Sequence, residues 1–228
     1  MAKRILVIAA HPDDEVFGCG ATISRLSAEG AKVHIAILGE GATSRSNHRE
    51  DASTDLVSRL QKNLKEAANI IGAQTVSTHG FPDNRFDSVD LLEIVKIVEK
   101  LVEDHKPELI FTHHIGDLNI DHQLTSRAVM TATRPLKGQV VREVLAFEIP
   151  SSTEWAFQRI EPIFRPDTFF DVSEVVENKI RAMSVYESES RPYPHPRSPQ
   201  ALRAIASRWG SVVGCAAAEA FEVIRSIR

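Results

Sequence analysis

The residues from Arg4 to Glu15 constrain the fold more than any other part of the chain. They begin with an apolar run, Ile5–Ala10, which is typical of a strand buried on both faces of a parallel sheet. The run ends in His-Pro-Asp-Asp-Glu, which places one imidazole and three carboxylates side by side. Buried unpaired charges are costly, and open α/β sheets bind ligands at the carboxyl ends of their strands. The stretch therefore predicts a functional site at the end of the first strand.

The residues that follow predict a doubly wound sheet. A helix is expected over 17–28, where apolar residues recur at helical spacing, and a second strand over 31–38. Strand, helix and strand in succession form the βαβ unit of a parallel sheet. Further strands are expected at 75–81, 108–113, 140–149 and 169–172, and further helices at 56–71, 91–105, 122–132, 175–186, 201–209 and 216–227. We therefore expect an α/β, Rossmann-like doubly wound, mostly parallel sheet with helices on both faces, in one domain over residues 1–228.

Composition narrows the class of partner. The net charge is −4 and the Lys and Arg residues are scattered, so neither nucleic acid nor an anionic membrane is an expected partner. Cys19 and Cys215 are the only cysteines and form no disulfide framework. No apolar run approaches the roughly 20 residues of a membrane span, and the first one is too short for a signal peptide. We expect a cytoplasmic protein that binds a small molecule, with a homo-oligomer left open.

A second polar cluster completes a metal site. The segment 113–122 follows another apolar run and contains three histidines, two aspartates and an asparagine. A catalytic zinc binds three N or O ligands and keeps one position for water. His11 and Asp14 can face one point, and one histidine of the second cluster would supply the third ligand. Asp13 then remains beside the metal, where it suits a general base. The spacing predicts metal-assisted hydrolysis.

The two motifs, AHPDDE at 10–15 and DLNIDH at 117–122, resemble those of the LmbE-like, or PIG-L, family of zinc-dependent N-deacetylases. The segment SRWGSVVGCAAAEAF at 207–221 also resembles the closing segment of that family. The resemblance implies zinc bound by His11, Asp14 and His122, with Asp13 as general base and Glu15 and Asp121 as supporting groups. The family removes N-acetyl groups, usually at C2 of a glucosamine unit, which gives acetate and a free amine.

One position departs from the family pattern. Many members carry histidine where this chain has Asn119, and that histidine stabilises the oxyanion or acts as an acid. An amide can donate a hydrogen bond to an oxyanion, but it cannot supply a proton. The acid would then be Asp13 itself or a histidine from elsewhere. His114, at a strand end, and His195, in a proline-rich loop, are the candidates, and position favours His114.

Several arginines in loops suggest that the aglycone of the substrate carries negative charge. Arginines at 45, 85, 191 and 197 fall in loops that could reach the pocket mouth, where they would suit an anionic aglycone such as a nucleotide diphosphate. Alternatively, they are solvated surface residues, and Asp83 pairs with Arg85 as loop structure. The candidate substrate-binding residues are Arg45, Asp83, Arg85, His195 and Arg197. The expected substrate is an N-acetylated sugar or sugar conjugate.

Two other functions remain open. The same metal chemistry would serve an amidase or deacylase on a non-sugar N-acyl group. A non-catalytic, metal-containing nucleotide-binding or sensor module is the other alternative, although no G-x-G-x-x-G motif follows the first strand. The expected cofactor is Zn2+, and Fe2+ binds the same donor set.

Overall fold

The computed structural model describes residues 2–41 and 54–228. Its strands form one seven-stranded sheet in the order β3-β2-β1-β4-β5-β7-β6. They are β1 (Arg4–Ala9), β2 (Lys32–Gly39), β3 (Thr75–Phe81), β4 (Leu109–His113), β5 (Glu143–Phe147), β6 (Thr168–Asp171) and β7 (Ala218–Ser226). Strands β1 to β5 are parallel to one another, and β7 runs antiparallel to both β5 and β6. The α/β, mostly parallel sheet is confirmed.

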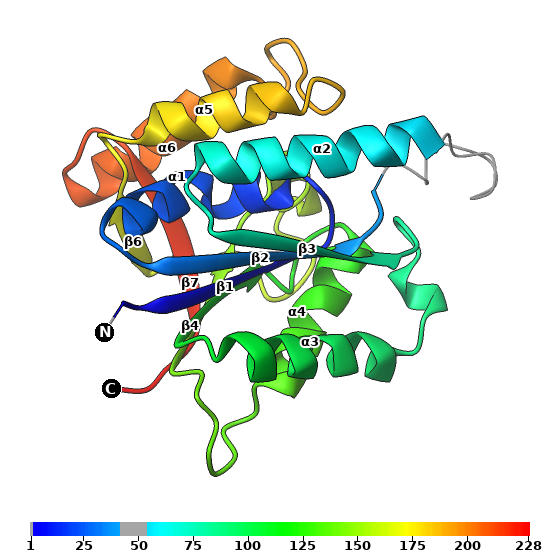
Figure 1. Ribbon diagram of the computed structural model, residues 1–228. Coiled ribbons are helices and arrows are strands. Elements are labelled where there is room, and N and C mark those ends of the chain that lie inside the picture. Colours follow the sequence, from blue (N-terminus) through cyan, green and yellow to red (C-terminus); the bar gives the residue numbers. More distant parts are fainter. Residues whose placement is uncertain (1, 42–53) are drawn as a thin grey trace.

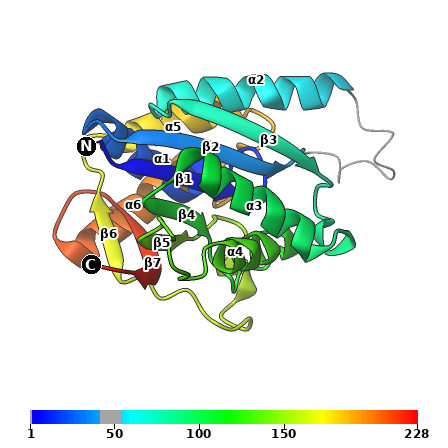
Figure 2. The same ribbon diagram turned by 60° about the horizontal axis from the view of Figure 1, so that its bottom comes forward.

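Helices cover both faces of this sheet (Figure 1). They are α1 (Asp14–Ala28), α2 (Thr54–Ile70), α3 (Leu91–His105), α4 (Ile120–Ala132), α5 (Val176–Val185) and α6 (Pro199–Val213), with short 3-10 turns η3 (Phe86–Ser88) and η4 (Glu154–Ala156). One apolar core joins the sheet to α1, α2, α5 and α6, and a second joins it to α3 and α4. Figure 2 shows α3 and α4 together on their face of the sheet. None of the helices in the described residues is long and apolar enough to cross a membrane.

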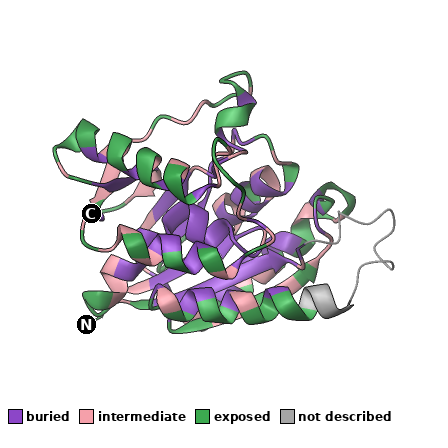
Figure 3. Cartoon of the chain, turned by 90° about the horizontal axis from the view of Figure 1, so that it is seen from above, coloured by how far each residue is buried: buried purple, intermediate pink, exposed green. Residues whose placement is uncertain are grey.

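The central strands bring the two polar motifs together. β1 lies between β2 and β4 and is parallel to both, so its carboxyl end lies next to that of β4. Every residue of β1 after Arg4 is buried, as are all residues of β4, because helices cover both faces of the sheet. Figure 3 shows the buried residues gathered in the interior of the chain. The chain leaves β1 into residues 11–15 and leaves β4 into residues 114–122. Two segments far apart in sequence therefore meet at one edge of the sheet.

The prediction of a helix over 216–227 is wrong. These residues form β7, which pairs with β5 on one side and with β6 on the other. The helix before it, α6, ends at Gly214, whose φ of 80° favours glycine. Alanine and glutamate have high helix propensity, but two neighbouring strands offered backbone hydrogen bonds that outweighed it. The sheet thus gains an antiparallel pair at its β6–β7 edge.

Helix α1 is kinked, and a buried ion pair spans the kink. Cys19 has φ −146° and ψ 17°, which is not helical, so the backbone groups around it lose their usual partners. Lys179 Nζ donates to the Phe17 carbonyl at 2.6 Å, while the carboxylate of Glu219 accepts from the N–H groups of residues 21–22. Lys179 and Glu219 also contact each other at 2.7 Å. This pair satisfies backbone groups that the kink leaves free.

Candidate metal centre and catalytic pocket

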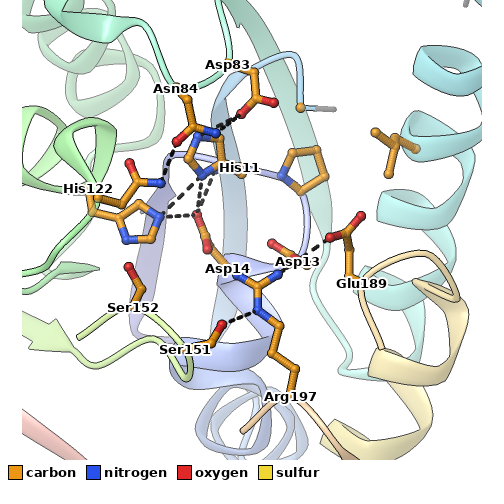
Figure 4. A pocket seen from close by; sticks show the side chains of 14 residues that line it. His11, Asp13, Asp14, Asp83, Asn84, His122, Ser151, Ser152, Glu189 and Arg197 are labelled. Atoms are coloured by element: carbon orange, nitrogen blue, oxygen red, sulfur yellow. Dashed lines mark hydrogen bonds and ion pairs between the residues drawn. The ribbon is translucent and has the colours of Figure 1, made fainter. Parts of the chain in front are cut away.

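Three side chains converge at the carboxyl ends of β1 and β4. His11 follows β1, Asp14 begins α1, and His122 lies in the first turn of α4. Asp14 Oδ2 lies 3.3 Å from His11 Nδ1 and 3.3 Å from His122 Nε2, and the two nitrogens are 3.3 Å apart. Figure 4 shows the three groups pointing toward one another. Together they form one of two groups of side chains in the described residues that could hold a metal ion.

The remaining ring nitrogens of the two histidines contact further side chains. His11 Nε2 lies 2.9 Å from Asp121 Oδ2 and 3.2 Å from Asp83 Oδ1; these three residues form the second possible metal group. A nitrogen that faces two carboxylates carries the proton, which leaves the lone pair of His11 on Nδ1. Asp117 Oδ1 lies 3.1 Å from His122 Nδ1 and orients that ring in the same way. Two imidazole nitrogens and a carboxylate oxygen, each supported from behind, fit a divalent metal ion.

The charges around the site favour a cation. Burial disfavours protonation of His122, but the carboxylates of Asp14 and Asp117 outweigh it and raise its pKa to about 9. Burial likewise opposes ionisation of Asp14, yet the neighbouring His122 and His113 hold its pKa well below the usual value. Because a metal ion binds the deprotonated ligands, protons and metal compete for this place.

The histidines of the second motif divide into different environments. His122 faces His11 and Asp14, as described above, whereas His113 Nε2 accepts a hydrogen bond from the Ala10 N–H at 2.9 Å. The His113 ring stacks on His122 at a centroid distance of 4.0 Å and an angle of 16°. Sequence spacing left open which histidine would join the ligand set, and His122 is the one that lies within 3.3 Å of both His11 and Asp14. His113 packs behind the set.

Asp13 lies next to the three converging groups. Its carboxyl group is 3.1 Å from Arg197 Nη1, and its N–H donates to Glu15 Oε2 at 2.9 Å. Burial raises the pKa of Asp13 well above its usual value, although the Arg197 guanidinium opposes the rise. Tyr186 donates its hydroxyl to Glu15 Oε1 at 2.7 Å, so Glu15 links α5 to the Asp13 backbone. The sequence analysis missed Tyr186, since nothing in its local pattern marks it.

A cavity of about 220 Å3 opens over these groups. Its lining comprises His11, Pro12, Asp13, Asp14, Gly41, Leu60, Asp83, Asn84, Asn119, His122, Ser151, Ser152, Glu189 and Arg197. Arg197 is the one lysine or arginine among these residues, and Figure 4 shows it between Asp13 and Ser151. Its Nη1 is 3.5 Å from Glu189 Oε2, and its Nε donates to Ser151 Oγ at 2.8 Å. The guanidinium is therefore already paired with two carboxylates of the pocket.

Asn119 caps helix α4 and also lines the cavity. Its Oδ1 accepts a hydrogen bond from the Asp121 N–H at 2.8 Å, which is the usual role of an N-cap side chain. Its Nδ2 donates to Asn84 Oδ1 at 2.8 Å. An amide NH2 has two N–H groups. The second N–H of Asn119 can therefore serve a bound molecule while the cap stays intact.

Residues 6–133 match the model of a protein family described as PIG-L, GlcNAc-PI de-N-acetylase. The chain belongs to the PIG-L family. It is 25% identical over 193 residues to a probable N-acetyl-alpha-D-glucosaminyl L-malate deacetylase 2 of Bacillus cereus, covering 83% of this chain and 85% of that protein. It is also 27% identical over 199 residues to 4-oxalmesaconate hydratase of Pseudomonas putida, and the match covers 79% of this chain and 72% of that protein. The structure of N,N'-diacetylchitobiose deacetylase from Pyrococcus horikoshii shares the fold, with a TM-score of 0.76 and 21% identity over 98% of this chain and 84% of that one.

His114 does not face the pocket of this PIG-L chain, contrary to the expectation that it donates a proton there. Its Nε2 lies 2.8 Å from the Pro162 carbonyl, and its Nδ1 lies 2.7 Å from Glu222 Oε2 on β7. The residue is buried and is absent from the cavity lining. Successive residues at a strand end point in opposite directions, so His114 turns away from His11, Asp14 and His122 when His113 packs against them.

Of the candidate substrate-binding residues, Asp83 and Arg197 line the pocket. Arg85 is exposed and lies outside the lining. His195 also lies outside it; its ring contacts Trp155 at a centroid distance of 5.6 Å, and its Nδ1 accepts from the Arg197 N–H. Arg191 bonds to the carbonyls of Ser188 and Ser190 and is likewise not part of the lining. Arg45 lies outside the described residues. An anionic aglycone thus finds no unpaired arginine in the described pocket wall.

Proposed function

We propose that this chain is a metal-dependent hydrolase that removes the N-acetyl group from an N-acetylglucosamine-type sugar or sugar conjugate. The observation that carries the proposal is the convergence of His11, Asp14 and His122 beside the buried Asp13 in one cavity. Membership of the PIG-L family and the deacetylase name of the Bacillus cereus relative support the same chemistry. The described residues form a single sheet that carries both motifs, which supports one catalytic domain over the chain.

The metal ligands in this proposal are His11, Asp14 and His122, and the expected ion is zinc, with iron(II) compatible with the same donors. When bound, such an ion acts as a Lewis acid toward the acetyl carbonyl and lowers the pKa of water toward ~7. Asp121 and Asp117 keep the two imidazoles oriented.

Asp13 is assigned both proton transfers. It accepts a proton from the attacking water as the new C–O bond forms, and it delivers that proton to the nitrogen as the amide C–N bond breaks. These two transfers give acetic acid and a free amine, which exchange a proton in water to form acetate and an ammonium ion, so atoms and charge balance. Asn119 cannot donate a proton and His114 faces away, which leaves Asp13 as the acid among the described lining residues. Arg197 orients the carboxylate through its contact with Oδ2, and the free N–H of Asn119 stabilises the developing oxyanion.

The test is acetate release from a panel of N-acetyl compounds. The protein is stripped with a chelator, reloaded with one equivalent of zinc, and incubated with N-acetylglucosamine, N,N'-diacetylchitobiose, UDP-N-acetylglucosamine and N-acetyl amino acids. We expect equimolar acetate and amine from at least one sugar, and none from the stripped protein. Full metal occupancy without acetate release from any sugar would refute the proposal, and release only from the amino acids would favour the non-sugar amidase.

The ligand assignment is tested separately through His122→Ala. This variant should lose most of its bound zinc, as measured by elemental analysis after gel filtration, because one of three ligands is removed. His105→Ala, on α3, is the matched control and should keep full occupancy. Unchanged zinc content in His122→Ala would show that His122 is not a ligand.

A further inference from the structure

A second cavity adjoins the catalytic pocket. It has a volume of about 600 Å3 and lies between α2 and the end of α5. The two helices pack side by side on the same face of the sheet, as Figures 1 and 2 both show. Leu60 of α2 lines both cavities, and Ser188 of the second is followed by Glu189 of the first. Leu60 and the segment 188–189 therefore lie where the two spaces adjoin.

The catalytic cavity alone is small for a sugar conjugate. Its volume of about 220 Å3 falls below the roughly 300–1,000 Å3 of typical small-molecule sites, whereas the second cavity falls within that range. A sugar whose N-acetyl group reaches the metal ligands fills the first cavity. The group joined to that sugar must then leave the first cavity, and the adjoining space is large enough to receive it.

The side chains of the second cavity indicate what that group is. Arg59, Asn63 and Glu66 recur at positions i, i+4 and i+7, so they form one polar stripe along α2. Glu187 and Ser188 face the cavity from the other side. The lining offers amide, hydroxyl and carboxylate groups, with one guanidinium against two carboxylates. Such a wall hydrogen-bonds to hydroxyl groups and repels a phosphate or a carboxylate.

The catalytic cavity also disfavours an anionic group. Its one arginine, Arg197, is paired with Asp13 and Glu189, and its wall also carries Asp83. Both spaces therefore present more carboxylates than guanidinium groups among the described residues. This reverses the expectation of an anionic aglycone that the arginine count of the sequence suggested.

We propose that the cavity between α2 and α5 is the aglycone subsite of the enzyme and that it takes a neutral, hydroxyl-rich unit such as a second sugar ring. The proposal rests on the deacetylase function proposed above and adds the substrate class. Uncharged N-acetylated glycosides are turned over in preference to the free monosaccharide, which leaves the subsite empty, and to sugar nucleotides, whose diphosphate meets Glu66 and Glu187.

The test compares kcat/KM for N,N'-diacetylchitobiose, N-acetylglucosamine and UDP-N-acetylglucosamine in the zinc-loaded protein. We expect kcat/KM for the disaccharide to exceed that for both of the others by at least about tenfold, since the monosaccharide makes no contact with the subsite and the diphosphate meets carboxylates there. Asn63→Trp and Ser184→Trp fill the subsite from its two walls and should lower the ratio of disaccharide to monosaccharide kcat/KM toward one. Lys62→Trp, exposed on α2 beside Asn63, should leave that ratio unchanged.

The outcomes separate the two proposals. If no sugar releases acetate, the deacetylase function itself fails. If acetate is released but the sugar nucleotide is the best substrate, or if both tryptophan variants keep the parent ratio, the aglycone subsite is refuted while the deacetylase function stands. Because Asn63 and Ser184 lie on different helices, a folding defect in one variant leaves the other to decide.

Discussion

Two buried polar clusters contact helix α1, and they differ in how their atoms are used. At the kink, Lys179 and Glu219 contact each other and the backbone groups that the kink frees, so donors are matched with acceptors. At the first turn, two imidazole nitrogens and the carboxylate of Asp14 converge within 3.3 Å. Both clusters bury charge, but only the cluster at the first turn brings metal-binding atoms to one point. The cluster at the kink, whose donors and acceptors are paired with each other, stabilises the fold. The cluster at the first turn, whose atoms point at one place, can bind a ligand.

The comparison predicts that the two clusters respond differently to mutation. A change in the converging cluster should reduce activity while leaving the fold intact. A change in the paired cluster should reduce the free energy of unfolding while leaving the chemistry of the folded fraction intact. Asp13→Asn, Glu219→Ala and Asn119→Ser test this contrast.

Asp13→Asn should lower kcat about 1,000-fold, within the range for loss of a general acid–base group, because an amide cannot carry the transferred proton. It should still bind one equivalent of zinc, since Asp13 is not a ligand. Acetate release and metal analysis on the same sample measure both. An activity equal to that of the parent would remove Asp13 from the mechanism.

Glu219→Ala should lower the free energy of unfolding by about 3 kcal/mol, because it leaves Lys179 buried without its partner and two backbone N–H groups without an acceptor. Urea denaturation measures the change. The matched control is Glu177→Ala, which removes an ion pair of the same 2.7 Å length that is exposed on the surface, and it should change the free energy of unfolding far less because solvent screens that pair. Equal costs for the two variants would contradict the distinction between buried and exposed pairs.

Asn119→Ser should lower kcat about tenfold or more, because serine keeps the N-cap of α4 but removes the N–H assigned to the oxyanion. The melting temperature should stay close to that of the parent. Asn119→Ala removes both functions and should lose stability as well as activity. If Asn119→Ser kept the parent kcat, Asn119 would be a structural cap only.

His34 provides a pH test away from both clusters. Burial, together with nearby His105 and His79, lowers its pKa from 6.5 to about 4. The unfolded chain therefore binds a proton at higher pH than the folded one, and this contribution to stability is lost as the pH falls from about 6.5 toward 4. At pH 5 the lowered pKa of His34 corresponds to a loss of about 2 kcal/mol in the free energy of unfolding. Solvent at the half-exposed edge strand β3 reduces this loss to about 1 kcal/mol.

His34→Gln should remove that loss. The difference in free energy of unfolding between pH 7 and pH 5 should be about 1 kcal/mol smaller in the variant than in the parent, by urea denaturation at both pH values. An identical pH dependence in the two proteins would show that His34 titrates alike in both states.

The sequence predicted those parts of the fold and the site that are formed by residues close together in the chain. The two motifs directly follow apolar strands, so their meeting at one sheet edge follows from parallel pairing. Contacts between distant segments had no such pattern: Arg197 and Asp13 are 184 positions apart, and Tyr186 and Glu15 are 171 apart. The role of Glu219 was also out of reach, because its partner Lys179 and the kink at Cys19 become adjacent only in three dimensions. For β7, the residues have high helix propensity, but hydrogen bonds to β5 and β6 make the segment a strand.

The backbone at Asp13 has a φ of 119° and a ψ of −30°, a conformation that glycine adopts freely and aspartate adopts at a cost of about 1–3 kcal/mol. Glycine at this position would therefore make the protein harder to unfold and, under the proposed mechanism, inactive. Laboratory evolution for heat tolerance alone would drift toward glycine here, and only a screen that also scores turnover would hold the aspartate in place.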